Sequence, residues 1–171
     1  MSTEPTAENA REYVWERTRL LARLVLTRQK GTTVSELGGS FDIGVDFLVK
    51  CGKRIGKLKI VPLFGVELSG TLEPLKTEHE ADRKARTKFK LWSTKAVFLF
   101  PIMFMLFSVE SDAGYFGWLL EPTITHQGFP KLERVSRIDL KKIDTDTMNI
   151  AFDHIQAWYE AMAVITMKEV E

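Results

Sequence analysis

The feature that most constrains this sequence is a continuous apolar run at residues 96–109, which reads AVFLFPIMFMLFSV. The run is shorter than the ~20 residues that a membrane-spanning helix needs, and Pro101 interrupts it. Apolar residues at consecutive positions, rich in Phe, Ile, Leu and Val, are typical of a strand that is covered on both faces. The run therefore predicts a buried central strand, with other layers on both sides of its sheet, and no membrane partner.

Helical and extended segments alternate along the rest of the chain. Capping signals and apolar residues at helical spacing predict helices over about residues 9–28, 77–92 and 146–168. Short apolar runs predict further strands, at about residues 45–49, 63–68, 115–120 and 134–138. This order predicts an α/β (α+β) fold with a mixed central sheet flanked by helices. Because no repeat or linker divides the 171 residues, we expect a single domain over residues 1–171.

Composition excludes several classes of protein. Lys and Arg number 24 against 23 Asp and Glu, so a polybasic binder is excluded, although a local basic patch is not. The single cysteine, Cys51, excludes a disulfide framework and a multi-cysteine zinc site. Its basic neighbours predict a lowered pKa, but no histidine lies nearby in sequence to act as a base. The first nine residues are polar and lack the pattern of a signal peptide, so we expect a cytoplasmic protein.

Two acidic residues, Asp46 and Glu67, interrupt apolar strands. Successive side chains of a strand point to opposite faces, so each carboxylate is expected on the face opposite its apolar neighbours. These neighbours are Val45, Phe47, Val49, Val66 and Leu68. Two carboxylates from adjacent strands that meet in one cleft would suit a hard cation such as Mg²⁺. The alternative is that both are edge or surface residues that share no site.

The sequence around these carboxylates resembles a known family. The segments DIGVD at 42–46 and VELSG at 66–70 are similar to the D-x-G-I-D and V-Q-V-K-G/S strands of a bacterial domain family of uncharacterised function. That family belongs to the restriction-endonuclease-like PD-(D/E)XK superfamily. Residues 95–109 resemble its proline-containing strand after a helix, and YFGWL at 115–119 resembles its aromatic hairpin strand. The likeness extends from about residue 11 to 159 and implies a restriction-endonuclease-like fold.

The resemblance implies Mg²⁺-dependent cleavage of nucleic acid, DNA above all. Asp46 matches the metal-binding aspartate and Glu67 the second acidic ligand, whereas Ser69 replaces the superfamily lysine. A serine hydroxyl can hydrogen-bond a water but supplies no positive charge to the developing phosphate. Either a lysine from elsewhere reaches the site, with Lys84 or Lys88 as candidates, or the site is inactive.

In the second case the chain would be a catalytically degenerate nuclease fold that serves as a DNA- or protein-binding module. A third alternative is an unrelated α/β interaction protein in which the motif is a coincidence. Lys50 shares the alternation of Asp46, but four residues along a strand is ~13 Å, a long reach. Glu12 or Glu16 would supply the further acidic ligand that some superfamily members have. The resemblance also implies a homodimer or a larger assembly.

A basic cluster in the second predicted helix is the candidate nucleic-acid-binding surface. Its members are Arg83, Lys84, Arg86, Lys88 and Lys90. Such a cluster would neutralise phosphates. Acidic residues precede the cluster in the same helix, and acidic-first, basic-last order is also what the helix dipole favours. The cluster is therefore either a phosphate-binding surface or a solvated helix face.

Overall fold

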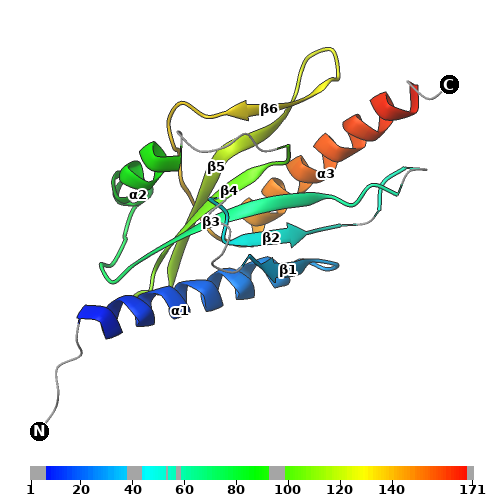
Figure 1. The fold of residues 1–171 in the computed structure, drawn as a ribbon. Helices are drawn as coiled ribbons and strands as arrows, with labels where there is room; N and C mark the ends of the chain where they lie inside the picture. Colours follow the sequence, from blue (N-terminus) through cyan, green and yellow to red (C-terminus); the bar gives the residue numbers. More distant parts are fainter. Residues whose placement is uncertain (1–6, 38–43, 53, 57–58, 93–98, 169–171) are drawn as a thin grey trace, which may run out of the picture.

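The computed structural model describes residues 7–37, 44–52, 54–56, 59–92 and 99–168 (Figure 1). The elements, in chain order, are α1 (Ala7–Thr27), β1 (Thr33–Glu36), β2 (Phe47–Lys50), β3 (Leu63–Thr71), α2 (Glu78–Trp92), β4 (Ile102–Ser108), β5 (Ala113–Ile124), β6 (Pro130–Arg134), β7 (Lys141–Lys142) and α3 (Thr145–Lys168).

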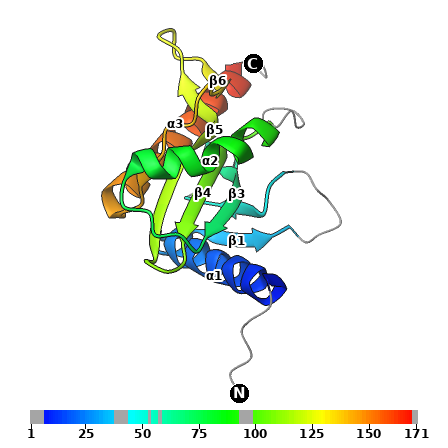
Figure 2. The same ribbon diagram turned by 90° about the vertical axis from the view of Figure 1, so that its left-hand side faces the viewer.

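The strands form one mixed sheet in the order β1-β2-β3-β4-β5-β6, and β7 also pairs with β5. Strands β3 and β4 are parallel, and α2 lies in the connection between them. Every other pairing in this sheet is antiparallel. Helices α1 and α3 pack on one face of the sheet and α2 packs on the other (Figures 1 and 2). The predicted mixed sheet flanked by helices is confirmed.

Strand β4 is the buried central strand that the apolar run predicts. It begins directly after Pro101, and all seven of its residues are buried. Residues 96–98, the start of the predicted run, lie outside the described residues. Alternate side chains of β4 enter the two cores. Met103, Met105 and Phe107 face α1 and α3, whereas Ile102, Phe104 and Leu106 face α2.

The region after β5 differs from the prediction. Strand β5 continues to Ile124, beyond the predicted end at residue 120, and only a short turn separates it from β6, which begins at Pro130. The strand expected over 134–138 is wrong, because β6 ends at Arg134 and β7 follows only at Lys141. Pro130 opens an edge strand, where a residue without an N–H is tolerated.

Strand β1 is an edge strand that was not predicted. Its four residues, TVSE, are exposed or half-buried and show no apolar alternation. Glu36 at its end forms ion pairs with Arg19 and Arg23 of α1. These pairs hold the edge strand against the helix.

None of the helices in the described ranges of the chain combines the length and the apolarity that crossing a bilayer would require.

Candidate functional site

Asp46 lies one residue before β2, at the point where the chain enters the sheet. Its backbone N–H donates to the Val66 carbonyl at 2.8 Å. Its side-chain Oδ2 accepts a hydrogen bond from the backbone N–H of Leu68 at 2.6 Å. The carboxylate therefore takes the place of a strand carbonyl. It extends the hydrogen bonding of β3 to the residue before Phe47, where β2 begins.

The predicted alternation around Asp46 is wrong at Val45. Val45 packs in the core on the α2 side, whereas Phe47 and Val49 pack in the core on the α1 and α3 side. The chain bends at Asp46, and its N–H reaches Val66, which is already registered opposite Phe47. Two successive residues thus face one residue of β3, as in a β-bulge, and the alternation shifts by one.

Glu67 lies in the middle of β3 and is only 8% exposed. Its neighbours Val66 and Leu68 belong to the core under α1 and α3, so the Glu67 side chain is on the α2 face. Its registered partner on β4, Phe104, lies in the α2 core as well. Glu67 directly precedes Leu68, whose N–H donates to Asp46, so the two acidic residues lie on neighbouring segments of the sheet.

Ser69 follows two residues later on β3 and is half-buried. By the alternation of the strand it shares the face of Glu67. The alternation of β3 thus places Glu67 and Ser69 on the face opposite Val66 and Leu68, the face that α2 covers.

The lysines that could replace the missing motif lysine differ in their positions. Lys84 is exposed on α2, and its Nζ binds Glu73 Oε1 at 2.7 Å, just beyond the end of β3. This hydrogen bond lowers the pKa of the Glu73 carboxyl. Lys88 lies in the same helix, but its side chain is outside the part of the structure that is described. Lys50 is exposed at the opposite end of β2 from Asp46.

Glu12 and Glu16 are exposed on α1. Glu16 forms an ion pair with Arg19 of the same helix at 2.8 Å. Helix α1 covers the sheet face opposite Glu67, so neither residue joins the carboxylate pair.

Helix α2 separates its apolar and basic residues. Ala81, Ala85 and Phe89 face the sheet. Arg83, Lys84, Arg86 and Lys90 are exposed. The acidic first turn has structural partners of its own, since Glu80 accepts from the Lys76 N–H at 2.8 Å and Glu78 from the Lys142 N–H at 3.0 Å. The basic half of the helix is therefore presented to solvent on the same side of the sheet as Glu67.

Within the ranges that the structure describes, no three His, Cys, Asp or Glu side chains gather closely enough to hold a metal ion. Asp42, the first acidic residue of the DIGVD segment, lies outside them. A site in the described region would therefore rest on Asp46 and Glu67, with further ligands from water or substrate.

Cys51 differs from its predicted character. The side chain is 2% exposed, in the core under α1 and α3. Burial raises the pKa of the Cys51 thiol to about 12, instead of lowering it. The basic residues near it in sequence do not compensate for the loss of solvent, and a nucleophilic role is not supported.

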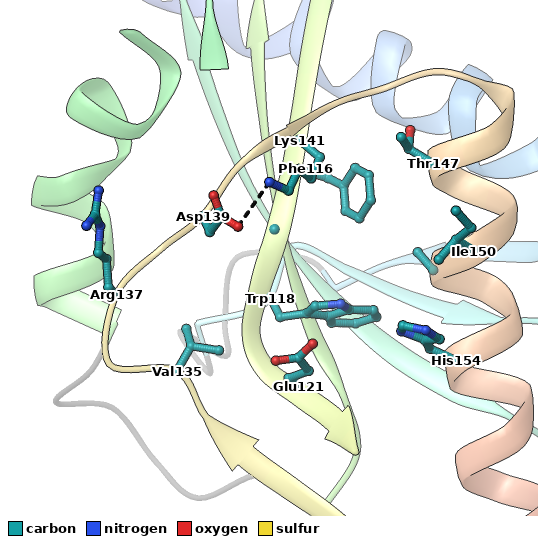
Figure 3. A pocket seen from close by; sticks show the side chains of 12 residues that line it. Phe116, Trp118, Glu121, Val135, Arg137, Asp139, Lys141, Thr147, Ile150 and His154 are labelled. Carbon is teal, nitrogen blue, oxygen red and sulfur yellow. Dashed lines mark ion pairs between the residues drawn. The ribbon is translucent and has the colours of Figure 1, made fainter. Parts of the chain in front are cut away.

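Sequence reasoning missed one pocket of the molecule. It lies between β5, the segment 135–141 and the first half of α3, with a volume of about 460 Å³ (Figure 3). Trp118 of β5 and His154 of α3 line it. The aromatic segment at 115–119 is the only signal in the sequence, and it predicts a hairpin strand.

We compared the chain with models of protein families, with curated proteins and with solved structures. None of the three comparisons found a significant match.

Proposed function

We propose that this chain is a restriction-endonuclease-like domain that acts on nucleic acid through a divalent cation, Mg²⁺, held by Asp46 and Glu67. The observation that carries the proposal is that the Asp46 carboxylate accepts from the Leu68 N–H, the residue next to the buried Glu67 on β3. Burying a charged side chain costs free energy unless partners compensate for it. Glu67, whose neighbours on β3, Val66 and Leu68, are apolar, is therefore a candidate for function.

The donor set fits Mg²⁺. Both side chains offer hard carboxylate oxygens, and Mg²⁺ in proteins is commonly held by one or two carboxylates together with waters and substrate phosphates. The hydrogen bond from the Leu68 N–H occupies one of the about four lone-pair sites of an ionised Asp46 carboxylate. When bound, the cation would activate water and neutralise charge on the phosphate.

The residues of the chain would divide the remaining work. The Leu68 N–H fixes the orientation of the Asp46 carboxylate. The Ser69 hydroxyl, two residues beyond Glu67, would orient a water by hydrogen bonding. The exposed basic side chains of α2 would bind backbone phosphates on the same side of the sheet. The order of the motif strands, the helix, the apolar strand and the aromatic strand supports the superfamily relationship proposed from the sequence.

A second candidate function is that of a degenerate nuclease fold that binds DNA or a protein without cleaving it. Ser69 supports this alternative, since it lacks the charge of the lysine expected there. So does the engagement of Lys84 with Glu73, which directs that ammonium group to another carboxylate. In this case binding would remain and cleavage would be absent.

The test combines cation binding and cleavage in three variants. Asp46→Asn keeps an oxygen for the Leu68 N–H and removes the charge, and Glu67→Gln is the matching change on β3. Both should abolish Mn²⁺ binding measured by calorimetry and any Mg²⁺-dependent DNA cleavage. Asp153→Asn, an exposed acidic residue of α3, is the control and should change neither.

Ser69→Lys then separates the two candidate functions. If only the lysine is missing, this substitution should raise the rate of cleavage by about 10²–10³. Cation binding that survives both Asp46→Asn and Glu67→Gln would overturn the proposed site. Cation binding without cleavage, even in Ser69→Lys, would favour the binding module.

A further inference from the structure

The pocket between β5 and α3 has a clear structural origin. Strand β6 pairs with the second half of β5 and β7 with its first half. Val135 still donates to the Leu119 carbonyl at 3.4 Å, but residues 135–140, between β6 and β7, form no strand. The middle of β5 is thus open beside α3. The pocket at this place has a volume of about 460 Å³, within the ~300–1,000 Å³ typical of small-ligand pockets.

The walls of the pocket are flat and apolar. Phe116 and Trp118 come from β5, and Ile150 comes from α3. Trp118 is half-buried, whereas Ile150 is 55% exposed. Figure 3 shows the Trp118 ring directed toward the His154 ring across the pocket. An open aromatic wall of this kind suits a planar ligand that stacks on it.

The polar groups around the pocket define what such a ligand would carry. Asp139 and Lys141 form an ion pair with each other at 3.1 Å. Glu121 is half-buried and lies close to Trp118 in Figure 3. Among the residues that the structure describes, its carboxylate has neither a hydrogen bond nor an ion pair. An ionised carboxylate only accepts hydrogen bonds, so the ligand must donate them.

The charges of the lining decide against a strongly anionic ligand. Two acidic side chains, Glu121 and Asp139, are balanced by two basic ones, Arg137 and Lys141. With His154 neutral, their formal charges sum to zero. A phosphate would gain little from this environment, so the part of the ligand that enters the pocket should be neutral.

We propose that this pocket binds a guanine base. The base would stack on Trp118, and its N1–H and 2-amino group, two adjacent donors, would pair with the two oxygens of Glu121. The corresponding edges of adenine and cytosine combine a donor with an acceptor, and the acceptor would face the carboxylate unfavourably. The proposal is independent of Asp46 and Glu67, which lie in another part of the sheet.

Calorimetric titration with nucleosides in the presence of EDTA tests the proposal without any contribution from a cation site. Guanosine should bind saturably, and at least tenfold more tightly than adenosine or cytidine. Glu121→Gln offers one acceptor and one donor in place of two acceptors, and should weaken guanosine binding by tenfold or more. Glu110→Gln, an exposed glutamate in the turn between β4 and β5, is the matched control and should leave binding unchanged.

Two further measurements complete the test. Trp118→Leu should also weaken binding by about tenfold, and if that variant fails to fold, the two glutamate variants decide the question. Single-stranded DNA with one guanine, compared with guanosine, distinguishes a base within a strand from a free nucleoside. The absence of saturable guanosine binding would overturn the proposal, as would equal binding of adenosine or full binding by Glu121→Gln.

Discussion

The two faces of the central sheet differ in what they bury. The face under α1 and α3 is covered by two long helices and buries mainly apolar side chains. Its polar groups include Thr18 of α1, the Tyr159 hydroxyl, which donates to the Leu63 carbonyl, and the Trp158 N–H, which donates to the Lys131 carbonyl. The face under α2 buries polar groups as well. These are Glu67, Thr71, Asp82 and Ser108.

The polar groups on the α2 face make specific contacts. Asp82 accepts from the Leu140 N–H at 2.8 Å, and the Tyr115 hydroxyl donates to the Leu75 carbonyl at 3.2 Å. Burial also raises the pKa of Tyr115. Buried polar groups stabilise a fold less than apolar ones do, because their desolvation must be offset by such contacts. The comparison indicates that both faces are apolar cores, and that the buried carboxylates among the described residues, Glu67 and Asp82, lie on the α2 face.

The largest expected effect tests whether both faces form a true core. Phe104→Ala and Phe107→Ala remove the same side chain from opposite faces of β4, and both residues are buried. Each should lower the free energy of unfolding by ~3–5 kcal/mol, measured by urea denaturation. A loss below ~1 kcal/mol for Phe104→Ala alone would mean that α2 does not pack on the sheet in solution.

The pH dependence of the free energy of unfolding tests the α1 and α3 face at Cys51. The thiol on the α1 and α3 face has a pKa of about 12 in the folded protein, against ~8.5 when unfolded. The folded state therefore holds a proton that the unfolded state has lost. Stability from this group is complete below about pH 8.5 and falls toward pH 12, by roughly 1 kcal/mol per pH unit. Denaturation between pH 8 and 10.5 should show a shallower decline for Cys51→Ala than for the wild type.

Asp46 tests whether the carboxylate site also holds the sheet together. Asp46→Ala leaves the Leu68 N–H without its acceptor and should cost ~1–3 kcal/mol of stability. Asp46→Asn keeps an oxygen acceptor and should cost less than ~1 kcal/mol. Equal stability of all three proteins in urea would show that this hydrogen bond does not contribute to the pairing of β3.

The smallest effect concerns the attachment of α1. Arg17 donates to both carboxylate oxygens of Asp112, at 2.9 and 2.8 Å, in the turn between β4 and β5. Both side chains are well exposed, so Asp112→Asn should cost only ~0.2–1 kcal/mol, and less at high salt. Asn tolerates the positive φ of this position, so the substitution isolates the ion pair. A cost that does not change with salt would argue against an electrostatic origin.

The sequence predicted the elements whose pattern is strong. The apolar run gave β4, because only a strand covered on both faces buries every residue. Alternation placed Glu67 and Ser69 on one face of β3, in agreement with the packing of their neighbours. The same rule was wrong at Val45, because the bend at Asp46 is a local backbone irregularity that residue types do not reveal.

Other features depend on contacts between distant segments. Strand β1 is polar and exposed, so no periodicity marks it, and pairing with β2 alone defines it. The pocket beside Trp118 arises from the gap between β6 and β7 and from the approach of α3, 30 residues or so farther along the chain. The raised pKa of Cys51 likewise follows from burial in the folded core, which the basic residues near it in sequence do not reveal.

The ion pairs of Glu36 have a consequence for self-association. An open sheet ends in a strand with unpaired backbone groups, onto which a second molecule could add its own strand. Here that strand, β1, is only four residues long, and Glu36 is engaged by two arginines of α1. A short, charged edge strand of this kind discourages edge-to-edge pairing with the sheet of another molecule, and so discourages aggregation. Helix α1 thus covers the core and, through Arg19 and Arg23, also protects this edge of the sheet from pairing with other molecules.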